Sequence, residues 1–103
     1  MTTHRPVPNA LTIAGSDPSG GAGIQADLKS FSALGAYGTS IITALTAQNT
    51  RGVRGVHPIP VEFIRLQLDT LLDDVALDAV KIGMVASREV AETIRDALEA
   101  RRP

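Results

Sequence analysis

The sequence contains no cysteine and no tryptophan, and aromatic residues make up only 3% of its 103 residues. Without cysteine the chain has no disulfide, no thiolate metal ligand and no thiol nucleophile. It also has no apolar run close to 18 residues long, which is the shortest that a membrane-spanning helix needs. The first six residues, MTTHRP, lack the apolar segment of a signal peptide. We therefore expect a cytoplasmic protein with a core of Leu, Ile, Val and Ala.

An excess of charge of either sign is also missing, since 10 Lys and Arg face 11 Asp and Glu for a net charge of −1. With no basic stripe, we expect neither nucleic acid nor a membrane as a partner. Hydrophobic residues make up 44% of the chain and charged residues 20%, which is typical of a folded domain. We assign residues 1–9 to an N-terminal tail and residues 10–103 to one domain or part of one.

Glycine, by contrast, is concentrated near the N-terminus. The apolar run Leu11–Ala14 predicts a buried strand, and it leads into the loop GSDPSGGAG at residues 15–23 and then into an amphipathic helix. A glycine-rich turn at a helix N-terminus can present backbone N–H groups and the helix dipole to a ligand. A binding loop is therefore one interpretation, and a turn that only lets helix and strand pack closely is another.

Two nucleotide motifs almost match this loop. Gly15 and Gly20 have the spacing of G-x-x-x-x-G-K-[ST], but Gly21 and Ala22 replace the Lys and Ser/Thr that reach phosphate and Mg²⁺. Residues 21–26 match G-x-G-x-x-G/A, but no acidic residue for a ribose follows at the required distance. Neither motif is complete, so neither identifies a nucleotide site.

The remaining hydrophobic pattern predicts the order β-α-β-α-β-α. Strands are expected at residues 11–14, 39–45 and 79–82, helices at 24–34, 61–73 and 88–101, and a polar connection at 48–55. Strands that alternate with helices predict an α/β fold with a mainly parallel sheet. Ligands of such sheets bind beyond the carboxyl ends of the strands. The segments expected to meet there are the glycine-rich loop, Gln48–Asn49 and Gly83–Met84.

Four segments in this order resemble the hydroxymethylpyrimidine/phosphomethylpyrimidine kinases of thiamine biosynthesis. They are ALTIAGSDPSGGAGIQADLK at 10–29, FSALGAYG at 31–38, ITALTAQNTRGV at 42–53 and KIGM at 81–84. The resemblance covers residues 10 to about 100. It implies a ribokinase-like, three-layer α/β/α fold and relates the chain to the vitamin B6 kinases.

The resemblance also implies that the glycine-rich loop lies on the substrate side of the cleft. In that family the ATP site, the catalytic residue and the Mg²⁺ that accompanies ATP belong to later parts of the chain. We therefore expect an N-terminal part of a kinase or a truncated gene product, with no catalytic residue, no metal ligand and little activity alone. The substrate would be hydroxymethylpyrimidine or its phosphate, and the full-length enzyme would be a homo-oligomer.

Gln48 is the leading candidate for substrate binding. A primary amide places an acceptor oxygen beside two N–H donors, which matches an amine and a ring nitrogen on the edge of an aminopyrimidine. The resemblance places a substrate-binding glutamine at this position. The alternative is a solvated loop residue, or one that caps Asn49.

Each of the other candidates also has a structural alternative. Asp27 could accept a hydrogen bond from the substrate hydroxymethyl group, or could be a first-turn acid that complements the helix dipole. Met84 could lie against a flat ring or fill the core. Asp17 between Ser16 and Pro18 predicts an Asx turn.

Backbone contacts with the ligand are expected from Gly15, Ala22 and Gly23 in the loop and from Thr46 in the second strand. Lys81 is interpreted as a solvated residue at the edge of the sheet. The two histidines, His4 and His57, are expected to be exposed. The acidic residues between 69 and 78 are interpreted as a helix face and turn, not a metal site.

Three alternatives stay open. The first is a pyridoxine/pyridoxal kinase of the same fold, the second is a non-catalytic small-molecule-binding module, and the third is half of a dinucleotide-binding domain. In every case three parallel strands leave open sheet edges, so we expect a marginally stable monomer or self-association through an edge.

Overall fold

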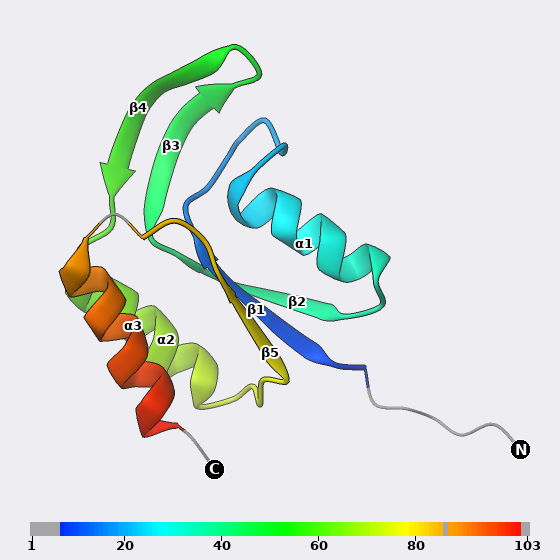
Figure 1. Cartoon of the computed structure of the whole chain (residues 1–103), viewed down its shortest axis with the longest axis vertical. Coiled ribbons are helices and arrows are strands. Elements are labelled where there is room, and N and C mark those ends of the chain that lie inside the picture. The colour runs from blue at the N-terminus through cyan, green and yellow to red at the C-terminus, as the bar shows by residue number, and fades with distance from the viewer. Residues whose placement is uncertain (1–6, 86, 102–103) are drawn as a thin grey trace, which may run out of the picture.

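The computed structural model describes residues 7–85 and 87–101, which form a sheet with helices on both faces (Figure 1). Helix α1 covers one face, and α2 and α3 lie together on the other. The elements are β1 (Asn9–Ala14), α1 (Gly23–Ala33), β2 (Tyr37–Ile42), β3 (Ala44–Asn49), β4 (Gly52–Pro58), α2 (Val61–Leu72), β5 (Ala79–Ile82) and α3 (Arg88–Ala100). The predicted α/β class and three-layer arrangement are confirmed.

The main sheet has the order β2-β1-β5, and both pairings are parallel. Asn9 to Ala14 of β1 pair with Tyr37 to Ile42 of β2, and Ala10 to Ile13 pair with Ala79 to Ile82 of β5. The central strand is buried from Ala10 to Ala14 because it is covered on both faces. The carboxyl ends of all three strands therefore meet at one edge of the sheet.

The apolar core lies between the sheet and the pair α2 and α3. Alternate residues of β1, Leu11 and Ile13, point into it because successive side chains of a strand face opposite sides. Ile64 and Leu68 of α2 are fully buried against them. The complete buried cluster is Leu11, Ile13, Ile41, Ile64, Leu68, Ile94 and Ala97. This core holds the sheet in place, and with it the carboxyl edge where the three strands end.

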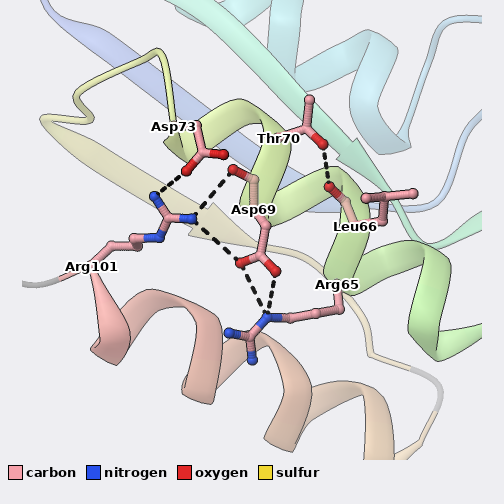
Figure 2. A network of polar contacts seen from close by, with 6 residues as sticks. All are labelled: Arg65, Leu66, Asp69, Thr70, Asp73 and Arg101. Atoms are coloured by element: carbon pink, nitrogen blue, oxygen red, sulfur yellow. Dashed lines mark hydrogen bonds and ion pairs between the residues drawn. The ribbon is translucent and has the colours of Figure 1, made fainter.

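A polar network joins the C-terminal halves of α2 and α3 (Figure 2). Arg101, which caps the end of α3, donates to the Asp69 carbonyl oxygen at 3.4 Å and pairs with the Asp73 carboxylate at 2.6 Å. Arg65 contacts both Asp69 carboxylate oxygens at 3.0–3.1 Å. Asp69 and Asp73 thus lie on the helix face and its end, as predicted, and their pairing with arginine is an addition from the structure. Exposed pairs of this kind add little free energy, so apolar packing holds the two helices together.

The helix ends follow the sequence signals. Ser87 accepts a hydrogen bond from the Val90 N–H at 3.2 Å and so caps α3, and Gly35 after α1 has a φ of +81°. Leu34, the last residue of the helix predicted at 24–34, is 84% exposed because α1 ends at Ala33. β1 begins at Asn9, so the predicted tail is one residue too long. His4 and Arg102 lie outside the described residues.

The predicted second strand is confirmed as β2, but its bounds of 39–45 are wrong because β2 ends at Ile42, and the polar connection predicted at 48–55 is wrong. The chain leaves the sheet at Thr43, whose N–H donates to the Ala14 carbonyl oxygen at 3.0 Å, and continues as an antiparallel hairpin of β3 and β4. Every residue of β4 is exposed, so this strand has no buried face. The hairpin extends beyond the carboxyl edge of the sheet, next to the loop that follows β1 (Figure 1).

Candidate functional site

The loop between β1 and α1 folds around the carboxylate of Asp17, which is 3% exposed. Its Oδ1 accepts hydrogen bonds from N and Oγ of Ser19 at 2.9 and 2.6 Å. Its Oδ2 accepts one from the Gly21 N–H at 3.1 Å. The Asp17 N–H itself donates to Oε1 of Gln25 at 2.7 Å. The predicted Asx turn is confirmed, and it belongs to a larger network that makes the loop rigid.

The Ser19 hydroxyl makes the largest contribution to holding the pKa of Asp17 below its ordinary value; desolvation opposes it, and backbone N–H groups support it. A carboxylate thus occupies the place where a phosphate would meet the N–H groups of a glycine-rich loop. The residues of this loop do not fit a nucleotide phosphate. This geometry argues against both nucleotide interpretations of the motif.

Gly23 closes the loop onto α1 and has a φ of +58°. A Cβ here would collide with the Gly15 carbonyl oxygen and lie 3.3 Å from the backbone nitrogen of Asp17. That same carbonyl accepts the Ile24 N–H at 3.0 Å, so the start of α1 packs directly against the backbone that follows β1. Both backbone conformation and space require glycine at this position.

We expect Gly23→Ala to lower the free energy of unfolding by about 2 kcal/mol, because the side chain adds backbone strain and displaces the loop. Chemical denaturation measures the loss. Gly52→Ala is the matched control, since nothing lies within 4 Å of its added Cβ and its φ is not positive. Equal losses in the two variants would contradict the argument.

Ser16 joins this loop to the base of the hairpin through hydrogen bonds to Ala44 and Thr46. Its N–H donates to the Ala44 carbonyl oxygen at 2.9 Å, and its Oγ accepts the Thr46 N–H at 3.0 Å. The Thr46 hydroxyl donates to the Ser16 carbonyl oxygen at 2.9 Å. The Thr46 N–H is therefore already bonded to Ser16. A main-chain contact between Thr46 and a ligand would have to use the Thr46 carbonyl oxygen.

Gln48 lies two residues further along β3, half-buried, where a bulge interrupts the pairing with β4. Its Oε1 is 3.1 Å from the Thr46 hydroxyl oxygen, whose single hydrogen also serves the closer Ser16 carbonyl oxygen. A half-turn of the amide would let Nε2 donate to the same hydroxyl. Either orientation leaves Gln48 with at least one donor and at least one acceptor for a further partner.

Asp27 lies in the second turn of α1, so its interpretation as a first-turn acid is wrong. Its Oδ2 accepts the Thr12 hydroxyl at 2.6 Å, and Lys81 Nζ lies 2.9 and 3.1 Å from the two carboxylate oxygens. Lys81 is therefore not simply a solvated residue at the sheet edge. Desolvation favours protonation of Asp27, but the bonds from Thr12 and Lys81 together lower its pKa.

Met84 follows the carboxyl end of β5, and its side chain is 92% exposed, which contradicts its interpretation as a core residue. The Gly83 N–H donates to the Ile13 carbonyl oxygen at 2.9 Å, and a Cβ on Gly83 would lie 2.9 Å from that of Ala14. The strand end that carries Met84 is thus directly beside the one that leads into Gly15.

Other features of the structure involve residues outside this group. An apolar hollow of about 310 Å³ is lined by Ile82, Val85, Ala91, Ile94, Arg95, Leu98 and Glu99, between β5 and α3. His57 is exposed on β4, as predicted. Within residues 7–85 and 87–101, no helix combines the length and apolar character needed to cross a bilayer. The same residues contain no cluster of three or more side chains suited to hold a metal ion.

Comparison with known proteins identifies close relatives of this chain. A family model for phosphomethylpyrimidine kinase matches residues 17–103. The hydroxymethylpyrimidine/phosphomethylpyrimidine kinase of Escherichia coli K12 is 62% identical over 91 residues, which are 88% of this chain and 34% of that protein. The chain therefore spans about a third of the length of this relative.

Solved structures agree. The crystal structure of phosphomethylpyrimidine kinase from Clostridium difficile 630 matches with a TM-score of 0.87 and 53% identity, over 93% of this chain and 42% of that one. Pyridoxal kinase from Staphylococcus aureus, in complex with AMP-PCP and pyridoxal, matches with a TM-score of 0.82 and 38% identity, over 93% and 36%. These matches confirm the ribokinase-like fold and the resemblance found in the sequence. The chain belongs to the phosphomethylpyrimidine kinase family.

Proposed function

We propose that this chain forms the pyrimidine-binding part of a kinase that phosphorylates hydroxymethylpyrimidine and then its monophosphate with ATP. The observation that carries the proposal is the connection between Ser16 and Thr46, which sets the Gln48 amide beside the loop at the carboxyl edge of the sheet. An amide with one donor and one acceptor left is suited to the paired polar edge of an aminopyrimidine.

In this proposal the other candidate residues surround the same ring. Met84 supplies an adaptable thioether surface for its flat face, and Asp27 accepts a hydrogen bond from the hydroxymethyl group. Gly15, Ala22 and Gly23 let the backbone approach the ligand closely. The chain's task is to orient the hydroxymethyl oxygen, since positioning dominates phosphoryl transfer.

ATP, its Mg²⁺ and the catalytic residue are assigned to the parts of the kinase that this chain does not include. The Asp17-filled loop supports this division, because it leaves no cradle for a nucleotide phosphate. We further propose that the whole kinase is a homo-oligomer. The outer edge of β5, where all four residues are exposed, is a surface that more of the kinase or a second copy would cover.

A pyridoxal kinase is the second candidate function. It is favoured by the 38% identity to the Staphylococcus aureus enzyme, whose structure contains pyridoxal. Pyridoxal also carries a hydroxymethyl group on a flat heterocycle, but it has no amine beside a ring nitrogen to pair with the Gln48 amide. The choice between the two substrates therefore depends on Gln48.

Calorimetric titration of the purified chain with hydroxymethylpyrimidine and, separately, with pyridoxal tests the proposal. We expect saturable binding of the pyrimidine and weaker binding of pyridoxal, with no turnover when ATP and Mg²⁺ are added. Tighter binding of pyridoxal would favour the second function. Binding of neither ligand would overturn both, and turnover would contradict the absence of a catalytic residue.

A further inference from the structure

Lys81 occupies an unusual position for a charged residue. It lies in the short strand β5, between Val80 and Ile82, which face the core side of the sheet. Lys81 is paired in register with Thr12 of β1, and both side chains point to the face covered by α1. Asp27 extends from α1 onto this pair, so one carboxylate joins three elements that are up to 69 residues apart in the sequence.

The two carboxylate oxygens of Asp27 accept different numbers of hydrogen bonds. Oδ2 receives the Thr12 hydroxyl at 2.6 Å and Lys81 at 2.9 Å, while Oδ1 receives Lys81 alone at 3.1 Å. A carboxylate has about four lone-pair sites, so Oδ1 retains capacity for a further hydrogen bond. The arrangement therefore orients the group without saturating it.

Burial makes the charge of Lys81 important. The Asp27 side chain is 18% exposed and that of Lys81 50% exposed, while Thr12 is fully buried. Within the described residues, Lys81 is the cationic side chain that forms an ion pair with Asp27. Lys29, on the same helix, donates instead to the Gly20 carbonyl oxygen. β2, which also packs on α1, has no charged side chain, and its Tyr37 stands at the opposite end of the strand.

Lys81 is also next to the strand end that carries Met84. A Cβ on Gly83 would lie 3.7 Å from Lys81 Nζ, so the ammonium group borders the turn between β5 and Met84. The ion pair thus links the carboxylate on α1 to the same edge of the sheet as the rest of the candidate site.

We propose that Lys81 is a positioning residue of this site, which fixes the Asp27 carboxylate so that Oδ1 can accept a hydrogen bond from the substrate hydroxymethyl group. The proposal rests on the proposed function. Lys81 acts through Asp27 and does not itself touch the reacting atoms. A purely structural tie would change stability but would leave the ligand affinity of the folded chain unchanged.

The test uses the full chain with Lys81→Met, Lys81→Arg and Asp27→Asn, and with the Lys81→Met/Asp27→Asn double variant. Arg88→Met is the control, since it breaks an exposed ion pair with Glu92 on α3, away from the site. Two quantities are measured for each folded variant: affinity for hydroxymethylpyrimidine by calorimetry, and, where Asp27 is kept, its pKa by carboxyl ¹³C NMR.

We expect Lys81→Met to weaken pyrimidine binding about tenfold and to raise the pKa of Asp27 toward or above 3.8, its ordinary value. Lys81→Arg should restore both, and Arg88→Met should change neither. In the Asp27→Asn background, loss of Lys81 should have no further effect on affinity, because coupled residues are not additive. Lys81→Gln gives a second neutral variant if the methionine variant does not fold.

Unchanged affinity in Lys81→Met, with a clear loss in Asp27→Asn, would overturn this inference and leave the proposed function standing. Losses that add in the double variant would also overturn it, since Lys81 would then act independently of Asp27. If the unchanged chain does not bind the pyrimidine, the proposed function fails. The NMR titration then still decides whether Lys81 controls the charge of Asp27.

Discussion

Replacement of Gln48 by alanine should weaken binding of hydroxymethylpyrimidine to this chain by about 50-fold. The variant loses one donor and one acceptor, each contributing about 1–1.5 kcal/mol when the partner is desolvated in the complex. The ligand's amine and ring nitrogen are then buried without partners, which is the costly outcome. Calorimetric titration of both proteins at one pH measures the ratio of dissociation constants.

Asn49→Ala is the matched control. Asn49 is the next residue of β3, it is exposed, and its side chain points to the opposite face of the strand. Its Oδ1 accepts the Arg51 N–H at 2.9 Å in the hairpin turn, so its removal should leave affinity within about twofold. Gln48→Glu separates the two halves of the amide, because a carboxylate keeps the acceptor and loses the donors.

If Gln48→Ala binds the pyrimidine as well as the unchanged chain does, Gln48 is not the residue that recognises its polar edge. If the variant loses pyridoxal and pyrimidine equally, the amide does not discriminate between the two ring systems. Either result would mean that substrate preference is determined by the loop or Met84 and not by the hairpin.

The helices could be predicted from the sequence because each buries one apolar face. Ile64 and Leu68 recur at helical spacing and both are fully buried, so α2 was predicted to within one residue at each end. α3 was also predicted within one residue of its end, and Ser87 before it is a residue type that favours the N-cap and does cap the helix. β5 was found as a short apolar run.

The β3–β4 hairpin could not be found in this way. Its strand β4 is exposed along its whole length, so burial imposes no alternation of apolar and polar residues. The β-branched run from Thr39 to Leu45 also hides the break at Thr43, where the chain leaves one sheet for the other. This position depends on backbone contacts with Ala14 and Ile59, residues far away in the sequence.

In the candidate site, the contacts between near neighbours were predictable and the distant ones were not. The Asp17 turn involves residues two to four positions away and was predicted. The Asp27–Lys81 pair joins residues 54 positions apart and was missed. One signal was present, since a lysine in a short apolar strand can pair with an acidic residue on the helix that covers the same face, and α1 offers Asp27.

Replacement of Leu68 by alanine should lower the free energy of unfolding by about 3 kcal/mol, the largest stability effect that we expect from one side chain. Leu68 is fully buried in the single core cluster, among residues of β1, β2, α2 and α3. The lost apolar contact and the remaining cavity both contribute. Thermal and urea unfolding, followed by circular dichroism, measure the change.

This loss is large because the chain has its core on one side of a three-stranded sheet. Domains of this size have a free energy of unfolding of about 5–15 kcal/mol, so a loss of about 3 kcal/mol is a large part of it. We expect the unfolding temperature of the variant to be about 12–20 °C lower. Leu66→Ala is the control on the same helix: Leu66 is 55% exposed, and its replacement should cost less than about 1 kcal/mol. Equal losses of stability at the two positions would mean that α2 is not packed on the sheet as described. The sheet whose carboxyl edge lies next to Gln48 and Asp27 would then not be stabilised by this core.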